Sequence, residues 1–300
     1  MIIQLPDDAH RISLRRVDGD GRASDVIGHL VASNDEQMVV LPEDRPAVWI
    51  PREEIRSVRK VPNRTVLPMS TPDALQRVLD VTWPGVRRAR LGGWVLRQGR
   101  SATKRANSVL ASGDPGLPWR DAVAEASTWM GVAPVLQVVS DDAIVAEALG
   151  DGYELVSPTV VMVAKLEDLT PAAMDGVVVG SRPGEGFVGL WPAGQVDEAV
   201  LEEATAARAT YLSVPGVASG RVARAGEWAV ISCVEVAASR RGEGLGRQIT
   251  RACVDAAATM GVRFVALQVE ADNEAARSLY AAESFVDHHS YYYLRPAGDR

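Results

Sequence analysis

A glycine-rich hexapeptide, Arg241-Gly-Glu-Gly-Leu-Gly246, follows an apolar run and precedes a helical pattern. The preceding residues 231–236 are rich in β-branched side chains, which predicts a strand. Apolar residues then recur at helical spacing at Leu245, Ile249, Ala252, Cys253, Ala256 and Ala257. Glycines let the backbone bring several N–H groups close to a ligand, and a helix N-terminus adds partial positive charge. The hexapeptide therefore predicts phosphate binding, although a plain strand-to-helix turn shows the same pattern.

The second segment with a chemical pattern is Leu-Gln-Val-Glu-Ala-Asp-Asn-Glu-Ala-Ala-Arg-Ser-Leu-Tyr, residues 267–280. It is predicted to form another strand followed by another helix. Nucleotide-binding motifs fit the hexapeptide poorly, because its spacing differs from G-x-G-x-x-G and no G-K-[ST] follows. Two motifs one strand–helix unit apart specify the chemistry more narrowly than either motif alone.

Together the two motifs resemble those of the GNAT superfamily of acetyl-CoA-dependent N-acetyltransferases. Arg241, Gly244 and Gly246 match the Q/R-x-x-G-x-G/A pyrophosphate loop of that family. The second segment matches L-x-V-x-x-x-N-x-x-A-x-x-L-Y at Leu267, Val269, Asn273, Ala276, Leu279 and Tyr280. The resemblance covers residues 175–295 well. It implies an α+β GNAT fold, with a mixed, mostly antiparallel, splayed sheet and helices on both faces.

The resemblance also implies acetyl-CoA as cosubstrate. The residues expected at its pyrophosphate are Arg241, Gly242, Gly244, Leu245, Gly246 and Arg247. Family members bind the pantetheine arm where a central strand splays from its neighbour, which implies Val234 and Val236. Asn273 is expected both to cap the following helix and to lie at the cofactor.

Acetyl transfer to an amine requires a bound thioester, a neutral nitrogen and a proton for the leaving thiolate. By resemblance Tyr280 donates that proton, and its ordinary pKa suits the role; the alternative is that Tyr280 only packs. The predicted catalytic residues are Tyr280, Asn273 and, as base, Glu235, because burial in a central strand raises the pKa of a carboxyl. Glu227, Glu270, structural salt bridges and water without a dedicated base are the alternatives.

One position departs from the family pattern. The family places a Gly-Phe pair after Leu-Tyr, and this chain has Ser284-Phe285. Since serine tolerates positive φ poorly, we expect an altered turn beside an intact cofactor loop.

The region upstream is predicted to contain two further parts. Residues 1–62 contain short strands separated by Gly, Pro, Asn and Asp, which predicts a small SH3-like β-barrel. Only Trp49 offers an aromatic contact there, which favours a structural appendage or an oligomer contact over peptide recognition. Residues 63–168 are interpreted as a degenerate GNAT-like copy without a phosphate loop. Residues 169–300 are the predicted catalytic domain, so one cofactor per chain is expected.

Three segments carry specific structural expectations. Residues 195–211 are predicted to be helical, and 217–224 are predicted to form a hairpin with 227–236. The segment Ser101–Pro118, rich in Ser, Gly, Asn and Pro, is predicted to be a lid or a disordered loop.

Composition narrows the class of protein. The 300 residues carry a net charge of −7 and are 47% hydrophobic, which indicates a globular chain with substantial cores. We find no basic leader and no apolar run of about 18 residues, so a cytoplasmic protein without a membrane partner is expected. Cys233 and Cys253 are expected to be reduced and buried. No metal site is predicted, because the adjacent His288 and His289 point to opposite faces of an extended chain.

A basic segment without any acid holds Arg87, Arg88, Arg90, Arg97, Arg100, Lys104 and Arg105. A solvated strand face is the favoured interpretation. Contact with the CoA 3′-phosphate or with an acidic partner is the alternative, and the overall acidic charge disfavours nucleic acid.

The sequence thus predicts transfer of an acetyl group to a primary amine by direct attack in a ternary complex. A small-molecule amine is favoured over a protein lysine. A CoA-binding pseudoenzyme or scaffold is the alternative from another class. The acceptor, the oligomeric state and the role of the barrel stay open.

Overall fold

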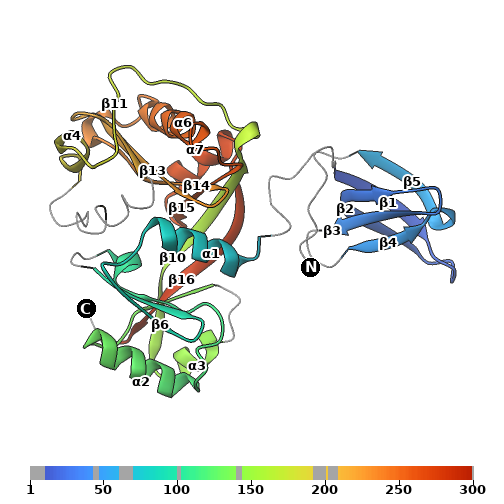
Figure 1. The fold of residues 1–300 in the computed structure, drawn as a ribbon, viewed down its shortest axis with the longest axis horizontal. Helices are drawn as coiled ribbons and strands as arrows, with labels where there is room; N and C mark the ends of the chain where they lie inside the picture. The colour runs from blue at the N-terminus through green and yellow to red at the C-terminus, as the bar shows by residue number, and fades with distance from the viewer. Residues whose placement is uncertain are drawn as a thin grey trace. The chain divides into compact units, whose positions relative to one another are not determined.

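The computed structural model describes residues 11–42, 47–60, 70–99, 103–139, 144–191, 201 and 209–298. The chain divides into two compact units, Met1–Thr71 and Pro72–Arg300 (Figure 1). Each unit has its own sheet and its own apolar core, so each is described by itself.

The first unit is a five-stranded antiparallel sheet in the order β4-β3-β2-β1-β5. Its elements are β1 (Arg11–Val17), β2 (Ala23–Ser33), β3 (Gln37–Pro42), β4 (Val48–Pro51), the 3-10 helix η1 (Arg52–Glu54) and β5 (Ile55–Lys60). Alternate residues of the strands face a small core that includes Leu14, Val40 and Ile50. The turn residues between short apolar runs thus indicated these strands correctly.

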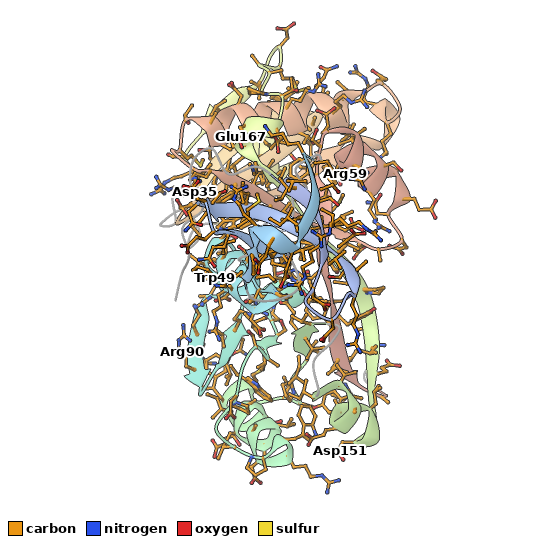
Figure 2. All side chains as sticks on the ribbon, turned by 90° about the vertical axis from the view of Figure 1, so that its right-hand side faces the viewer. Asp35, Trp49, Arg59, Arg90, Asp151 and Glu167 are labelled. Carbon is orange, nitrogen blue, oxygen red and sulfur yellow. The ribbon has the colours of Figure 1, made fainter. Side chains whose placement is uncertain are left out.

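The edge strands β4 and β5 do not pair with each other in the described part of this unit. The sheet is therefore open, and the closed SH3-like barrel is not confirmed. Trp49, on the edge strand β4, is 63% exposed (Figure 2).

The second unit is built on a single sheet of eleven strands among the described residues. Its first elements are α1 (Pro72–Thr82), β6 (Arg87–Leu91), β7 (Trp94–Gln98), η2 (Lys104–Ala106), β8 (Val109–Leu110), α2 (Trp119–Met130), β9 (Leu136–Val139), α3 (Ile144–Gly150), β10 (Tyr153–Lys165) and η3 (Leu166–Asp168). They are followed by β11 (Val178–Gly180), α4 (Glu185–Val188), β12 (Ala209–Val214), β13 (Ala218–Ala225), β14 (Trp228–Val236), η4 (Ala238–Arg240), α6 (Leu245–Ala258), β15 (Phe264–Glu270), α7 (Glu274–Ala282) and β16 (Val286–Pro296).

The strand order is β11-β12-β13-β14-β15-β10-β16-β9-β8-β7-β6. Two neighbouring pairs are parallel, β14 with β15 and β8 with β9, and the other pairs are antiparallel. The long strands β10 and β16 run through the middle of the unit, with α6 and α7 towards one end and α2 and α3 towards the other (Figure 1). This mostly antiparallel α+β sheet agrees with the predicted fold class.

The two central strands, β10 and β16, each pair with strands from the other part of the sequence. Strand β10 lies between β15 and β16, whereas β16 lies between β10 and β9. The sheet thus runs through strands from both sides of residue 168, where the sequence suggests a domain boundary. That boundary stays an interpretation of the sequence.

Two predicted segments differ from the structure. The described part of the segment Ser101–Pro118 is more ordered than the sequence predicts, because it contains η2 and the buried strand β8 between β7 and β9. A two-residue strand is too short to show alternation. The helix predicted over 195–211 falls mostly outside the described residues, and its end, Ala209–Tyr211, belongs to β12.

Helix α6 packs against β13 and β14 through the residues that its periodicity predicted. A Cβ on Gly220 of β13 would lie 2.5 Å from Sγ of Cys253, so glycine is needed for this close approach. Cys253 is fully buried and Cys233 is half-buried, and both are free thiols. The close packing of α6 on β13 and β14 sets the position of the helix N-terminus.

The basic segment splits into different environments. Arg87 is exposed on β6, and so is Arg90 (labelled in Figure 2), as the solvated-face interpretation predicts, but Arg97 is buried. Arg97 donates hydrogen bonds to Ser108 Oγ and Gln137 Oε1, each at 2.8 Å, and pairs with Asp80. A buried cation of this kind needs such partners. Arg100 lies outside the described residues.

Candidate active site

The glycine loop between β14 and α6 contains two residues in the left-handed region. Gly242 and Gly244 have φ of 86° and 78°, the left-handed region that L-residues with a Cβ avoid. Gly244 is the N-cap of α6 and supplies no side chain. The first-turn amides of a helix have no carbonyl partner within it, so they are free to face an anion.

The third glycine of the loop allows two helices to meet. A Cβ on Gly246 would lie 3.1 Å from Cδ1 of Leu279 in α7 and 4.0 Å from Cγ2 of Val236 in β14. Its size therefore brings the start of α6 close to α7 and to the end of β14.

All predicted cofactor and catalytic residues line one cavity of about 700 Å³, called the first cavity below. They are Val234, Glu235, Val236, Arg241, Gly242, Gly244, Leu245, Gly246, Arg247, Asn273 and Tyr280. They come from β14, the glycine loop, α6 and α7, so two sequence motifs meet at one place.

Strand β14 separates from β15 beside this cavity. The two strands pair from Trp228 with Phe264 to Ile231 with Leu267, and no pairing is found beyond, although both strands are described there. Cys233 has φ of 53°, and the register with β13 shifts between Ser219 and Arg221. This irregularity leaves the β15 side of Val234 and Val236 without a ladder partner.

Glu235 is not a stranded buried charge, contrary to the sequence-based expectation. Its side chain is 26% exposed, and Arg241 Nη2 donates to its Oε1 at 2.8 Å. The splay of the strands opens this position to solvent. Glu235 thus has a cationic partner from the glycine loop.

The other two glutamates lie at different places. Glu227 is exposed at the opposite end of β14, pairs with Arg263 at 3.6 Å and lines neither cavity described in this section. Glu270 is exposed at the end of β15 and lines a second cavity.

Tyr280 and Asn273 belong to the same helix. Asn273 caps α7, since its Oδ1 accepts a hydrogen bond from the Ala276 amide at 3.1 Å, which confirms the predicted cap. Tyr280 is 8% exposed and packs edge-on against Phe285. Burial raises the pKa of its hydroxyl, and Cys253 and Glu235 raise it further. Tyr280 therefore keeps its proton at neutral pH.

Glu283 was missed by sequence reasoning. It is buried and accepts ion pairs from Arg247 at 2.9 Å and from Arg251 at 2.7 Å. These arginines stand one turn apart on α6, so Glu283 fixes the Arg247 guanidinium beside the first cavity. The i, i+4 pair of arginines facing an acid at a helix end was the available signal.

The turn after α7 contains a serine where the family has a glycine. Ser284 has φ of 70°, in the left-handed region that serine tolerates poorly. The hydrogen bonds of Ser284 and Phe285 to the last carbonyls of α7 hold this conformation.

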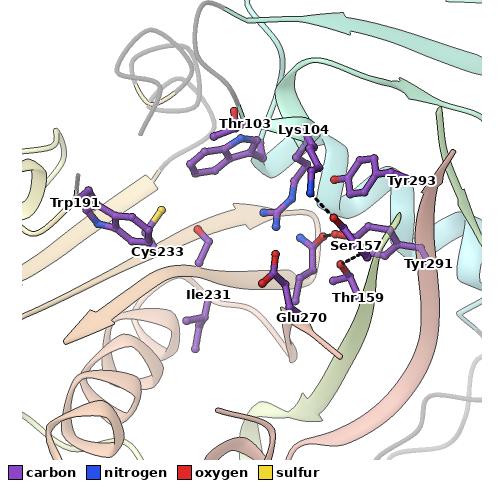
Figure 3. Close-up of a pocket in the computed structure, with 14 residues that line it drawn as sticks. Thr103, Lys104, Ser157, Thr159, Trp191, Ile231, Cys233, Glu270, Tyr291 and Tyr293 are labelled. Atoms are coloured by element: carbon purple, nitrogen blue, oxygen red, sulfur yellow. Dashed lines mark hydrogen bonds between the residues drawn. The ribbon is translucent and has the colours of Figure 1, made fainter. Parts of the chain in front are cut away.

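The second cavity has a volume of about 400 Å³ and lies at the splayed strands. Its wall from β14 and β15 consists of Ile231, Ser232, Cys233, Gln268 and Glu270. The remaining lining residues are Trp83, Thr103, Lys104, Arg105, Ser157, Thr159, Trp191, Tyr291 and Tyr293. Figure 3 shows Trp191 and Cys233 towards one end and Lys104, Tyr291 and Tyr293 towards the other, with Glu270 between.

The two histidines behave differently from the sequence expectation. Their Nδ1 atoms lie 2.7 Å apart, so the rings do not point to opposite faces. The register of β16 with β10 shifts at this point, which turns the two side chains towards each other. Among the described residues no cluster of His, Cys, Asp or Glu could hold a metal ion. No described helix is long and apolar enough to cross a membrane.

A mixed sheet with two parallel strands that separate beside a glycine loop and a helix N-terminus defines an acetyltransferase of the GNAT type. The chain belongs to the family described as "Probable histone acetyltransferase Rv0428c C-terminal", whose model matches residues 74–294. That match spans nearly the whole second compact unit.

The chain is also similar to individual proteins. The chain is 26% identical over 244 residues to the uncharacterized N-acetyltransferase YobR of Bacillus subtilis, covering 72% of this chain and 96% of YobR. A GCN5-related N-acetyltransferase from Kribbella flavida shares the fold with a TM-score of 0.56 and 18% identity, over 77% of this chain and 97% of that one. A GCN5-related N-acetyltransferase from Sphaerobacter thermophilus aligns with a TM-score of 0.44 and 19% identity, over 59% and 65%.

Proposed function

We propose that the protein transfers the acetyl group of acetyl-CoA to a primary amine by direct attack in a ternary complex. The observation that carries this proposal is the pair of cavities at the splay of β14 and β15. The first cavity is lined by the glycine loop and Tyr280, and the second by Glu270. Residues 231–233 line one cavity and 234–236 line the other, so the two meet along one strand.

The residues of the first cavity fit acetyl-CoA. Gly242 and Gly244 present backbone without side chains, and Arg241 and Arg247 supply positive charge for a pyrophosphate. The unpaired side of Val234 and Val236 offers backbone groups for the amides of a pantetheine arm. Bound acetyl-CoA would supply the activated thioester, and the protein would supply its orientation.

Tyr280 is the proposed acid that protonates the leaving sulfur. It lines the first cavity, and its raised pKa keeps the hydroxyl protonated across the physiological range. Asn273 acts indirectly in this proposal, because its cap fixes the first turn of the helix that carries Tyr280.

Glu270 is the proposed base, in place of Glu235. Glu270 lines the second cavity and forms no ion pair with any residue that the structure describes, whereas Glu235 is paired with Arg241. A free carboxylate at the acceptor site attracts the ammonium form of the amine and takes its proton, directly or through water.

The acceptor is proposed to be a small-molecule amine. The second cavity is bounded by side chains from both halves of the sheet, and its volume of about 400 Å³ is within the usual range for small-molecule sites. The description of the family as a probable histone acetyltransferase favours a protein lysine as the second candidate.

We also interpret residues 63–168 as a degenerate copy of 169–300. In β7-β8-α2-β9-α3-β10 and in β13-β14-α6-β15-α7-β16 the elements follow in the same order, and in each the first strand pair is antiparallel and the second parallel. The five antiparallel strands of residues 1–62 support an SH3-like appendage.

The test is release of CoA thiol from acetyl-CoA with a panel of small amines and lysine peptides. We expect small amines to stimulate release, and Glu270→Gln to lower kcat/KM by about 100-fold at neutral pH. Glu227→Gln is the matched control and should change little. Bound acetyl-CoA without release for any acceptor would instead support a CoA-binding scaffold, and labelling of peptides alone would favour a protein lysine.

A further inference from the structure

Three buried side-chain N–H groups at the second cavity have no hydrogen-bond partner among the residues that the structure describes. They are Trp83 Nε1, Arg105 Nε and Trp191 Nε1, all from residues that line this cavity. Indole and guanidinium groups only donate, so no rotation of these groups satisfies them. A buried donor without a partner is destabilising. Three of them around one cavity indicate a ligand rich in hydrogen-bond acceptors.

Two guanidinium groups make the part of the cavity beside Trp83 electropositive. Arg105 and Arg221 lie 5.8 and 5.1 Å from the centroid of the Trp83 ring. Arg221 is fully buried and donates to neutral oxygens, those of the Thr82 carbonyl at 2.9 Å and Ser232 Oγ at 3.2 Å. No described carboxylate forms an ion pair with either arginine. Buried positive charge without a counterion is costly, which points to an anion as the missing partner.

The cavity lining has two further charged groups, Lys104 and Glu270. Lys104 reaches across to Ser157, to whose Oγ it donates a hydrogen bond (Figure 3). Glu270 is the one carboxylate among the lining residues that the structure describes. The cavity therefore has two cationic side chains on its lining and one separate anionic side chain.

We propose that the acceptor is a small amine that also carries an anionic group, a carboxylate or a phosphate. The anionic group binds Arg105 and accepts from the Trp83 indole beside it, while the ammonium faces Glu270. This inference rests on the proposed function and names its substrate class. A polybasic peptide is disfavoured, because the arginines around Trp83 would repel its charges.

The experiment compares matched pairs of acceptors with the full-length protein. ω-Amino carboxylates of increasing chain length are assayed beside alkylamines of the same length, and aminoalkyl phosphates form a third series. We expect kcat/KM for the best anionic acceptor to exceed that of its matched alkylamine by about 10- to 100-fold, the effect of a charge-assisted hydrogen bond. The carboxylate and phosphate series show which anion fits.

Arg105→Gln tests the assigned contact. We expect it to lower kcat/KM for the anionic acceptor much more than for the matched alkylamine, so that the preference is lost; the KM for acetyl-CoA checks that the variant is folded. Arg105→Lys should restore part of the preference, and the exposed Arg90→Gln is the control. An equal loss for both acceptors of a pair, or no preference in the wild type, would overturn the proposal.

A binding measurement separates this proposal from the proposed function. Calorimetry with CoA-saturated protein measures affinity for ω-amino carboxylates and aminoalkyl phosphates without turnover. Binding that Arg105→Gln abolishes supports the anion site even if no acetyl transfer occurs, in which case the proposed function alone fails. Absence of binding by every anionic amine overturns the anion site even where alkylamines are acetylated.

Discussion

The loops that lead into α2 and α6 occupy comparable positions and have different surroundings. Each follows a strand, β8 or β14, and the helix leads to a parallel neighbour, β9 or β15. The first loop contacts the β6–β7 turn, since the Gly93 amide donates to the Asp114 carbonyl at 2.6 Å. The second loop has no atom within 4 Å of a Cβ placed on Gly242 or Gly244.

The first residues of the two helices also differ in what they contact. Trp119, the first residue of α2, is buried edge-on against Trp94, with ring centroids 6.3 Å apart. Helix α6 begins with Leu245 and Gly246 at the edge of the first cavity. The contrast shows that a strand–loop–helix frame does not make a ligand site by itself. In the proposed function the site depends on glycine backbone at a helix N-terminus that lines the first cavity.

The largest expected effect concerns Tyr280, for which the first half of the sheet has no counterpart in α3. Tyr280→Phe should lower kcat about 100-fold or more, because it removes the proposed proton donor, with little change in acetyl-CoA affinity. Steady-state kinetics and calorimetry measure the two quantities. Tyr153→Phe, beside Trp119, is the control and should keep full activity. An unchanged kcat in Tyr280→Phe would leave Tyr280 with a packing role alone.

Charge reversal tests the contrast between the two helix starts. Arg241→Glu should weaken acetyl-CoA binding about 100-fold, since it replaces an attractive charge at the pyrophosphate with a repulsive one. Arg120→Glu, on the exposed first turn of α2, should leave the dissociation constant unchanged. Calorimetry on both variants gives the comparison. Equal effects would show that the positive charge acts at long range and not at the glycine loop.

Alanine substitutions separate packing from binding. A Cβ on Gly92 would lie 2.4 Å from backbone atoms of Pro115, so Gly92→Ala should cost about 2–4 kcal/mol of unfolding free energy without weakening acetyl-CoA binding. Gly242→Ala meets no atom and should cost about 1–2 kcal/mol, from its positive φ alone, while it weakens acetyl-CoA binding. Urea denaturation and calorimetry test both. The reverse order of stability losses would contradict the contrast.

The polar core of the first half predicts the smallest effect, a dependence of stability on pH. Gln76 Nε2 lies 2.9 Å from His289 Nε2, and burial, with His288, lowers the pKa of His289 to about 3. The unfolded chain, with an ordinary histidine pKa of about 6.5, therefore binds more protons as pH falls below that value. Stability should fall by about 1.6 kcal/mol from pH 6.5 to 5 through this residue. In His289→Gln the unfolding free energy should change less over this range, and an identical slope would exclude His289 as the cause.

Local patterns predicted the elements around the first cavity. The periodicity of α6, the cap at Asn273 and the spacing of the two motifs are each encoded within a few residues. The loop glycines have a positive φ in the structure, a conformation that glycine adopts without a steric penalty. The sequence was sufficient here because each element is specified by its own neighbours.

Contacts between distant segments were beyond this kind of prediction. The ion pairs of Glu283 with α6, the partner of Glu235 and the exchange of β10 and β16 depend on tertiary arrangement. The second cavity combines Trp83 with Tyr293, and no local periodicity links them. Ser284 shows the same limit, because the surrounding turn and not the residue type decides its φ.

The exchange of β10 and β16 sets an order of events during protein synthesis. Thr159 of β10 pairs with Tyr291 of β16, near the C-terminal end. A ribosome adds about 5–20 residues per second, so β10 leaves the exit tunnel many seconds before either neighbour exists. Until β16 is made, the backbone edges of β10 lack their partners, and chaperones or transient contacts must shield its apolar side chains. Truncation by a premature stop before β16 would thus leave an unpaired central strand, a species prone to aggregate and to be degraded.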